Sequence, residues 1–158
     1  MVKFDERAIL DNGAYIYAMR QEIEAIADAV CEKGFDNILF TASGGSLAMM
    51  QPFDYMISVM SGLDVRSQVS AELLGIGNNR LTDRTLVFMA SKSGDTKETV
   101  EAAGYVKEKG AAIISVLGVE GSPLGGLSDY TVVYKDGRPQ EFVLYMLVGR
   151  ILHNKGYF

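Results

Sequence analysis

The sequence has no pair of cysteines and no long apolar run, and its first residues do not resemble a secretory signal. Its only cysteine, Cys31, cannot form an internal bridge, and its place in an apolar helical segment predicts a buried, inert thiol rather than a reactive one. No apolar run approaches the roughly 18 residues that span a bilayer. Residues 1–7 include acids where a secretory signal would be apolar. These absences predict a cytoplasmic protein outside membranes.

The sequence also lacks an excess of basic residues. Its 15 Lys and Arg against 20 Asp and Glu give a formal charge of −5, which argues against a general electrostatic hold on nucleic acid or anionic lipid. An anionic small molecule would therefore need a local site. The 158 residues contain no repeat, low-complexity tract or linker, and 48% of them are hydrophobic. We expect one domain over residues 1–158 with a packed core.

Apolar residues alternate between helical and strand patterns along the chain. An amphipathic helix is predicted over about 11–33, and another helix over about 140–154. Sheet and crossovers are expected over 37–134, with strands at 37–41, 64–69, 85–90, 111–116 and 130–134. Four strands are nearly all apolar, which is typical of strands covered on both faces, whereas 64–69 suits a sheet edge. The order predicts an α/β, three-layer αβα sandwich around a parallel sheet.

The loop after the first strand is rich in glycine and serine. Ser43-Gly44-Gly45-Ser46 opens the following helix, and its two glycines allow a tight turn and close approach to a ligand. A helix start also offers unpaired N–H groups to an anion. The same pattern is found in simple helix caps, so this loop alone leaves both interpretations open.

The loop after the third strand is rich in hydroxyl groups. Ser91, Ser93 and Thr96 surround the expected helix start, and Gly94 allows the chain to fold beneath a ligand. Asp95 and Glu98 fit a capping box. Hydroxyls together with free N–H groups form a neutral donor cup for a phosphate. A well-capped helix with polar neighbours is the alternative interpretation.

The loop after the fourth strand fits a helix cap. Ser122 precedes Pro123, which is the standard order at a helix start. This loop could still form one wall of a pocket, because the carboxyl ends of parallel strands lie at the same edge of the sheet.

The three loops together resemble those of the SIS (sugar isomerase) domain. The matching stretches are Ser43-Gly44-Gly45-Ser46, Ser91-Lys92-Ser93-Gly94-Asp95-Thr96-Lys97-Glu98 and Ser122-Pro123-Leu124. The resemblance runs from about Ile16 to the final helix and is strongest to the amino-terminal SIS half of fructosamine-6-phosphate deglycases and to the isomerase part of glucosamine-6-phosphate synthase.

The resemblance implies a flavodoxin-like five-stranded sheet that holds the phosphate of a phosphosugar. By position, Ser46, Ser91, Ser93 and Thr96 would bind the phosphate, and Ser43 and Gly45 would line the sugar. We expect no metal and no cofactor. We expect a homo-oligomer or a second SIS half as partner, because the final helix is apolar on almost every side.

The sequence departs from the deglycases and synthases in its catalytic groups. Those enzymes are about twice as long and carry their catalytic Glu and His in a second half, within a stretch like Gly-Glu-x-x-His-Gly that is missing here. Isomerisation needs an acid/base group. Glu72 is the best local candidate, or else an acid favoured by a helix start. His153 is more typical of a dipole partner at a helix end.

Three functions stay open. The first is a phosphosugar-binding domain of a sugar-phosphate isomerase or fructosamine-6-phosphate deglycase, either as an amino-terminal half or as a unit completed by self-association. The second is a regulatory SIS domain that senses phosphosugars without catalysis. The third is a flavodoxin-like cofactor binder, against which the three loops offer no aromatic residue to stack on a flavin.

Overall fold

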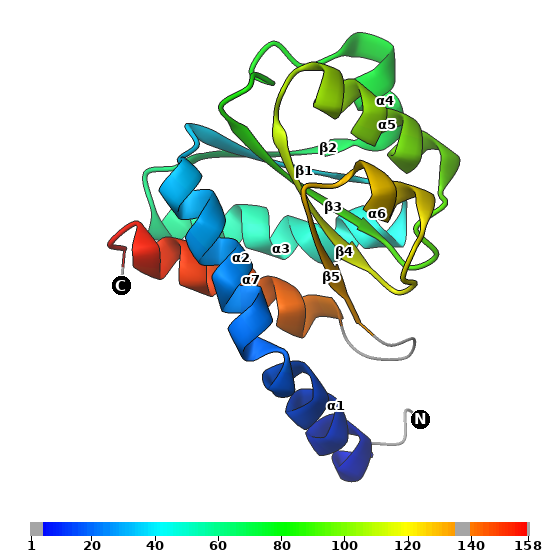
Figure 1. The fold of residues 1–158 in the computed structure, drawn as a ribbon. Coiled ribbons are helices and arrows are strands. Elements are labelled where there is room, and N and C mark those ends of the chain that lie inside the picture. The colour runs from blue at the N-terminus through cyan, green and yellow to red at the C-terminus, as the bar shows by residue number, and fades with distance from the viewer. Residues whose placement is uncertain (1–4, 135–139, 158) are drawn as a thin grey trace.

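A parallel sheet forms the centre of the protein (Figure 1). The structure, a computed structural model, describes residues 5–134 and 140–157. Within them the strands form a five-stranded sheet of order β2-β1-β3-β4-β5, the flavodoxin-like order that was expected. The strands are β1 (Asn37–Ala42), β2 (Asp64–Val69), β3 (Thr85–Ser91), β4 (Ala112–Leu117) and β5 (Tyr130–Val133). The predicted α/β sandwich is therefore confirmed.

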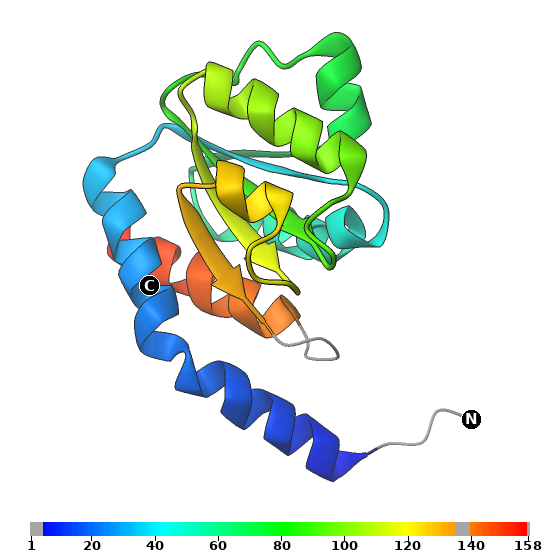
Figure 2. The ribbon, with the colours of Figure 1, turned by 45° about the vertical axis from the view of Figure 1, so that its right-hand side comes forward.

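Helices cover both faces of the sheet (Figures 1 and 2). They are α1 (Glu6–Ala18), α2 (Arg20–Lys33), α3 (Gly45–Met60), α4 (Ser70–Ile76), α5 (Lys97–Glu108), α6 (Pro123–Leu127) and α7 (Gln140–Asn154). Helices α2, α3 and α7 share one apolar core with the sheet, and α4, α5 and α6 share the other. The chain thus forms helices on either side of the parallel sheet, as alternating strands and helices require.

The two cores follow from the alternation of side chains along each strand. Phe40 and Phe88 point to the α2, α3 and α7 side, where their rings stack with centroids 4.9 Å apart. Leu39 and Val87 point to the opposite side. Strands β1, β3 and β4 are buried on both faces, whereas β2 is half-exposed and lies at the sheet edge, as its polar alternation predicted.

The amino-terminal region differs from the single helix predicted over about 11–33. Two helices, α1 and α2, meet at Met19, and α1 begins earlier, with Asp5 as a side-chain cap that accepts a bond from the Ala8 N–H. Helix α2 packs on the sheet through its apolar stripe, whereas α1 projects away from it (Figures 1 and 2). Ile16 is the single buried residue of α1. The sequence pattern did not reveal the break at Met19, because apolar residues continue at helical spacing across it.

Helix α7 packs between α2 and α3 and is tied to α2 by an ion pair. The Arg150 guanidinium donates to both carboxylate oxygens of Asp28, at 2.7 and 3.0 Å, and the Asn154 amide donates to the same carboxylate. These hydrogen bonds lower the pKa of Asp28 to about 2. Cys31, on the same helix as Asp28, is half-buried, and burial raises the pKa of its thiol, which favours the unreactive form.

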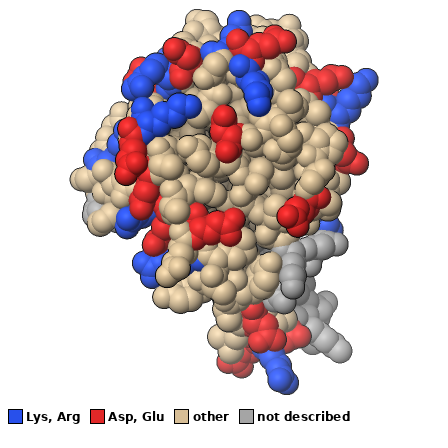
Figure 3. Space-filling view, viewed as in Figure 1, with Lys and Arg blue, Asp and Glu red and all other residues tan. Residues whose placement is uncertain are grey.

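On one face of the protein, charges of both signs are mixed (Figure 3). On the face drawn in Figure 3, basic side chains are interspersed with acidic ones rather than gathered into one patch. Across the described ranges, no helix combines the length and apolar character needed to cross a membrane.

Candidate functional site

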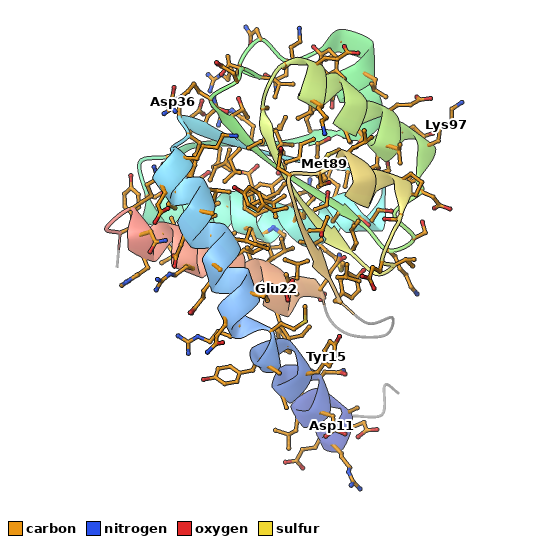
Figure 4. All side chains as sticks on the ribbon, in the orientation of Figure 1. Asp11, Tyr15, Glu22, Asp36, Met89 and Lys97 are labelled. Atoms are coloured by element: carbon orange, nitrogen blue, oxygen red, sulfur yellow. The ribbon has the colours of Figure 1, made fainter. Side chains whose placement is uncertain are left out.

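The candidate site lies where the crossovers leave the sheet in opposite directions. Strand β1 continues into α3 on one face, and its neighbour β3 continues into α5 on the other. Such a switch point leaves a crevice at the carboxyl ends of the strands, which is the usual ligand position in open α/β sheets. The starts of α3 and α5 both meet this edge, and Lys97 in Figure 4 marks the start of α5.

The loop after β1 (the β1 loop, residues 43–46) presents open backbone at this crevice. Gly44 has φ +56°, a conformation that favours glycine, and it is the N-cap residue of α3. A Cβ placed on Gly44 or Gly45 would meet no atom within 4 Å, so the main chain here borders open space. Ser46 lies in the first turn of α3 and is partly exposed. The β1 loop therefore offers both amides and a hydroxyl to a ligand.

The β3 loop (residues 91–96) is organised by the Ser91 hydroxyl. Ser91 is buried, and its Oγ accepts a hydrogen bond from the Gly94 N–H at 2.9 Å and lies 3.1 Å from Thr96 Oγ1. Ser93 is exposed and Thr96 is half-exposed. Ser91 thus holds the loop in shape from inside, while Ser93 and Thr96 border the solvent.

The predicted capping box of Asp95 and Glu98 is wrong. Helix α5 begins at Lys97 with Thr96 at its N-cap, and no side chain makes a cap hydrogen bond there. Both acids are exposed. The Thr96 hydroxyl lies against Ser91 instead, so the start of α5 has no side-chain acceptor of its own. An uncapped helix start is a favourable place for an anion.

Two hydroxyl pairs that the sequence did not predict connect the β1 crossover to the starts of two other helices. Ser43 Oγ lies 3.2 Å from Thr99 Oγ1, which joins the β1 loop to the first turn of α5. Thr41 Oγ1 lies 3.2 Å from Ser70 Oγ, which joins β1 to the start of α4. Thr99 follows Thr96 by three positions, so helical spacing could have placed both on one face. Its partner Ser43 required the tertiary structure.

The two acid/base candidates lie at opposite ends of the sheet. Glu72 is exposed in the first turn of α4, two residues after Ser70, and so belongs to the candidate edge. His153 is near the end of α7. Lys155, the first residue after α7, places its Nζ over the Phe35 ring, 4.3 Å from the ring centroid. Phe35 precedes β1, so His153 lies toward the amino ends of the strands, away from the candidate edge.

The loop after β4 (the β4 loop, residues 118–122) packs against the β3 loop and also lines an open groove. This groove has a volume of about 750 Å³, and its lining includes Gly118, Glu120, Tyr15 and Glu22. Figure 4 shows Tyr15 and Glu22 projecting from α1 and α2 on the side of the end of β5. Ser122 is the N-cap residue of α6, as predicted, but its side chain makes no cap bond.

The hydroxyls and main-chain amides at the described edge are uncharged hydrogen-bond donors, and exposed charged residues such as Asp95 and Lys97 lie beside them. Hydroxyls and main-chain amides from two loops surround two adjacent helix starts, a combination suited to an oxyanion. Among residues 5–134 and 140–157, no three His, Cys, Asp or Glu side chains are grouped closely enough to hold a metal ion.

Comparison with known proteins places these loops in a recognised family. A family model described as the SIS domain matches residues 34–152. Fructosamine deglycase FrlB of Bacillus subtilis (strain 168) is 32% identical over 120 residues, which cover 75% of this chain and 37% of the relative. The isomerizing glutamine–fructose-6-phosphate aminotransferase of Methanococcus maripaludis is 33% identical over 133 residues, covering 84% of this chain and 21% of the relative. The matched part of this chain thus spans well under half of these curated relatives.

Solved structures share the fold over most of the chain. A Bacillus subtilis protein described as a phosphosugar isomerase superposes with a TM-score of 0.81 at 29% identity, covering 86% of this chain and 44% of that one. The Vibrio vulnificus NanR protein, solved in complex with ManNAc-6P, superposes with a TM-score of 0.75 at 21% identity, covering 93% of this chain and 60% of that one. The second likeness concerns the fold alone.

Proposed function

This chain belongs to the SIS domain family, and from this premise we propose that it binds the phosphate of a phosphorylated sugar between the β1 and β3 loops. The observation that carries the proposal is the contact between Ser43 and Thr99, which joins the β1 loop to the first turn of α5 at the switch point of the sheet. Two helix starts and several hydroxyls then surround one position. Such a site suits a group with several anionic oxygens.

The proposed roles follow the exposure of each side chain. Ser46, Ser93 and Thr96 donate hydrogen bonds to the phosphate, since all three reach solvent. Ser91 also belongs to the proposed phosphate site. Its buried hydroxyl orients Gly94 and Thr96 and so shapes the β3 loop. Ser43 and the open main chain at Gly45 border the sugar.

The reaction that we propose is that of a sugar-phosphate isomerase or fructosamine-6-phosphate deglycase. Support comes from relatives named as a fructosamine deglycase and as isomerizing aminotransferases. Glu72 is the proposed acid/base group, because it follows Ser70 at the candidate edge. Since this chain spans only part of those relatives, further catalytic groups would come from a second SIS half or a second copy.

A partner is proposed for the apolar surface of α1, α3 and α7. Exposed side chains there include Leu10 (65%) on α1, Val59 (65%) on α3 and Tyr145 (55%) on α7. Helix α1 has one buried residue and is too short to be stable in water without packing. A second copy of this chain or a second SIS half would cover this surface. We also propose a cytoplasmic location, which cell fractionation would test.

The alternative function is a regulatory SIS domain that senses a phosphosugar without catalysis. The fold shared with NanR, which was solved with ManNAc-6P, is the observation that favours it. Turnover separates the two functions: we expect the isolated protein to bind, and Glu72→Gln to lower any isomerase or deglycase rate without weakening binding. Full binding and no turnover by the wild-type protein with its partner present would select the sensor.

Titration calorimetry tests the binding itself. We expect heat from fructose 6-phosphate or a fructosamine 6-phosphate and none from unphosphorylated fructose at the same concentration. Inorganic phosphate should compete with the sugar phosphate, because the proposed contacts are made to the phosphate oxygens. Equal heats from fructose and fructose 6-phosphate would reject a phosphate site.

A further inference from the structure

The β3 and β4 loops are interlocked through their main chains. The Leu124 N–H donates to the Gly94 C=O at 2.9 Å, and the Gly118 N–H lies 3.4 Å from the Ser91 C=O. A Cβ placed on Gly118 would overlap the carbonyl oxygen of Lys92. The path of the β3 loop is therefore set partly by its neighbour rather than by its own residues alone.

Ser122 fills the space beneath Gly94. A Cβ placed on Gly94 would overlap both Oγ and Cβ of Ser122, and Gly94 has φ +71°, where glycine is favoured. Ser122 is buried, with 7% of the residue exposed. Gly94 and Ser122 thus act as one packed unit, in which the missing side chain of the first makes room for the second.

The Ser122 hydroxyl is not explained by the stability of this structure. Its Oγ is fully buried and has no hydrogen-bond partner among the described residues. Burying a hydroxyl without a partner is unfavourable, and alanine would keep most of the packing at no such cost. Nor does the hydroxyl cap α6, although Ser122 occupies the N-cap position.

We propose that Ser122 is a positioning residue for the phosphate-binding loop. Its hydroxyl lies against Gly94 and makes a hydrogen bond to the main chain of residues 94–95 when an anion binds to the β3 loop, a bond that this structure does not contain. The Gly94 carbonyl, which accepts one bond from Leu124, has a second lone pair that can accept this one. This inference rests on the proposed phosphate site. A bond present only in the bound state contributes to affinity and not to the stability of the free protein.

Ser122→Ala tests this role through two measurements that should change differently. We expect the affinity for fructose 6-phosphate to fall about 3- to 10-fold, the range of one hydrogen bond. The unfolding midpoint of the free protein should stay the same or rise, because an unsatisfied buried hydroxyl is removed. Amide exchange of residues 91–96 should slow on ligand addition in the wild type, and slow less in the variant.

Ser115→Ala is the matched control. Ser115 is also a buried serine of this region, but its Oγ already pairs with Ser128 Oγ. Its replacement should lower the unfolding midpoint and leave the affinity unchanged. Ser122→Cys, which replaces the hydroxyl by a larger and weakly donating thiol, should show the same loss of affinity as Ser122→Ala and covers the case in which alanine fails to fold.

The outcomes separate this inference from the proposed function. Unchanged affinity in Ser122→Ala would overturn the positioning role while leaving the phosphate site intact. If the affinity and the unfolding midpoint of Ser122→Ala both fall, Ser122 contributes to packing and not to positioning. If the wild-type protein binds neither fructose 6-phosphate nor inorganic phosphate, the proposed function fails and this inference fails with it.

Discussion

Ser43 Oγ lies 3.2 Å from Thr99 Oγ1, although the two residues are 56 positions apart. Ser43 follows β1 and Thr99 lies in the first turn of α5, so this contact joins the two crossovers that diverge to opposite faces of the sheet. The hydroxyl pair is therefore both a structural link and a boundary of the proposed site. The effect of this pair on stability and its effect on ligand binding can be measured separately.

The first prediction concerns this pair. Thr99→Val keeps the shape of a fully buried side chain but removes its hydroxyl, so the free energy of unfolding should fall by about 1 kcal/mol. Combined with Ser43→Ala in a double-mutant cycle, the two changes should be less than additive. Strictly additive urea-unfolding energies would show that the contact contributes nothing.

The second prediction concerns the phosphate donors. Replacing Ser93 and Thr96 together by alanine removes two hydroxyls, and the affinity for fructose 6-phosphate should fall roughly 10-fold or more in calorimetry. The control is Ser58→Ala, which removes an exposed hydroxyl of α3 whose bond is to Asp54. Equal heats from the double variant and the control would contradict the roles of Ser93 and Thr96.

The third prediction concerns Gly94. Gly94→Ala places a Cβ on Ser122 at a positive φ, so we expect a loss of about 2–4 kcal/mol in unfolding free energy together with loss of phosphosugar binding. Gly104→Ala is the matched control, because Gly104 lies inside α5 and an added Cβ would meet no atom within 4 Å beyond its chain neighbours and its own helix backbone. It should stabilise the protein by about 0.5–1 kcal/mol. Similar denaturation midpoints for both variants would refute the steric explanation.

The fourth prediction concerns pH. The pKa of Asp28 is lowered from 3.8 to about 2 by hydrogen bonds from Arg150 and Asn154. A lowered folded-state pKa means that the ionised carboxylate favours folding, so its contribution is present above about pH 4 and is lost as the pH falls toward 2. Thermal unfolding of Asp28→Asn should therefore depend less on pH in this window than that of the wild type. If the unfolding temperatures of the variant and the wild type fall equally with pH, Asp28 does not contribute to the acid sensitivity.

The fifth prediction concerns self-association. If a second copy covers the exposed apolar surface, Leu10→Glu or Val59→Glu should convert the oligomer into monomers in sedimentation velocity. Ile76→Glu is the control, since Ile76 is 77% exposed on α4, which packs on the opposite face of the sheet. A wild-type protein that sediments as a monomer at all concentrations would reject the second copy as partner.

Much of the fold could be predicted from local patterns. The apolar runs of β1, β3 and β4 identify strands buried on both faces, and the polar alternation of β2 identifies an edge strand. Helix caps were predicted less well. The sequence favoured a capping box at Asp95, but Thr96 became the N-cap because Ser91 organises the loop from inside. The break at Met19 was missed because the apolar spacing continues across it.

The sequence alone determined that hydroxyls and glycines follow two buried strands, because strand and loop residues differ in polarity and in allowed backbone conformation. Tertiary structure alone decided which hydroxyls meet, since Ser43 reaches Thr99, and Ser122 packs under Gly94, only after the sheet has brought distant loops to one edge. Tertiary structure also places His153 toward the amino ends of the strands, away from the candidate edge. Long-range contacts depend on the order of the strands, which local periodicity does not encode.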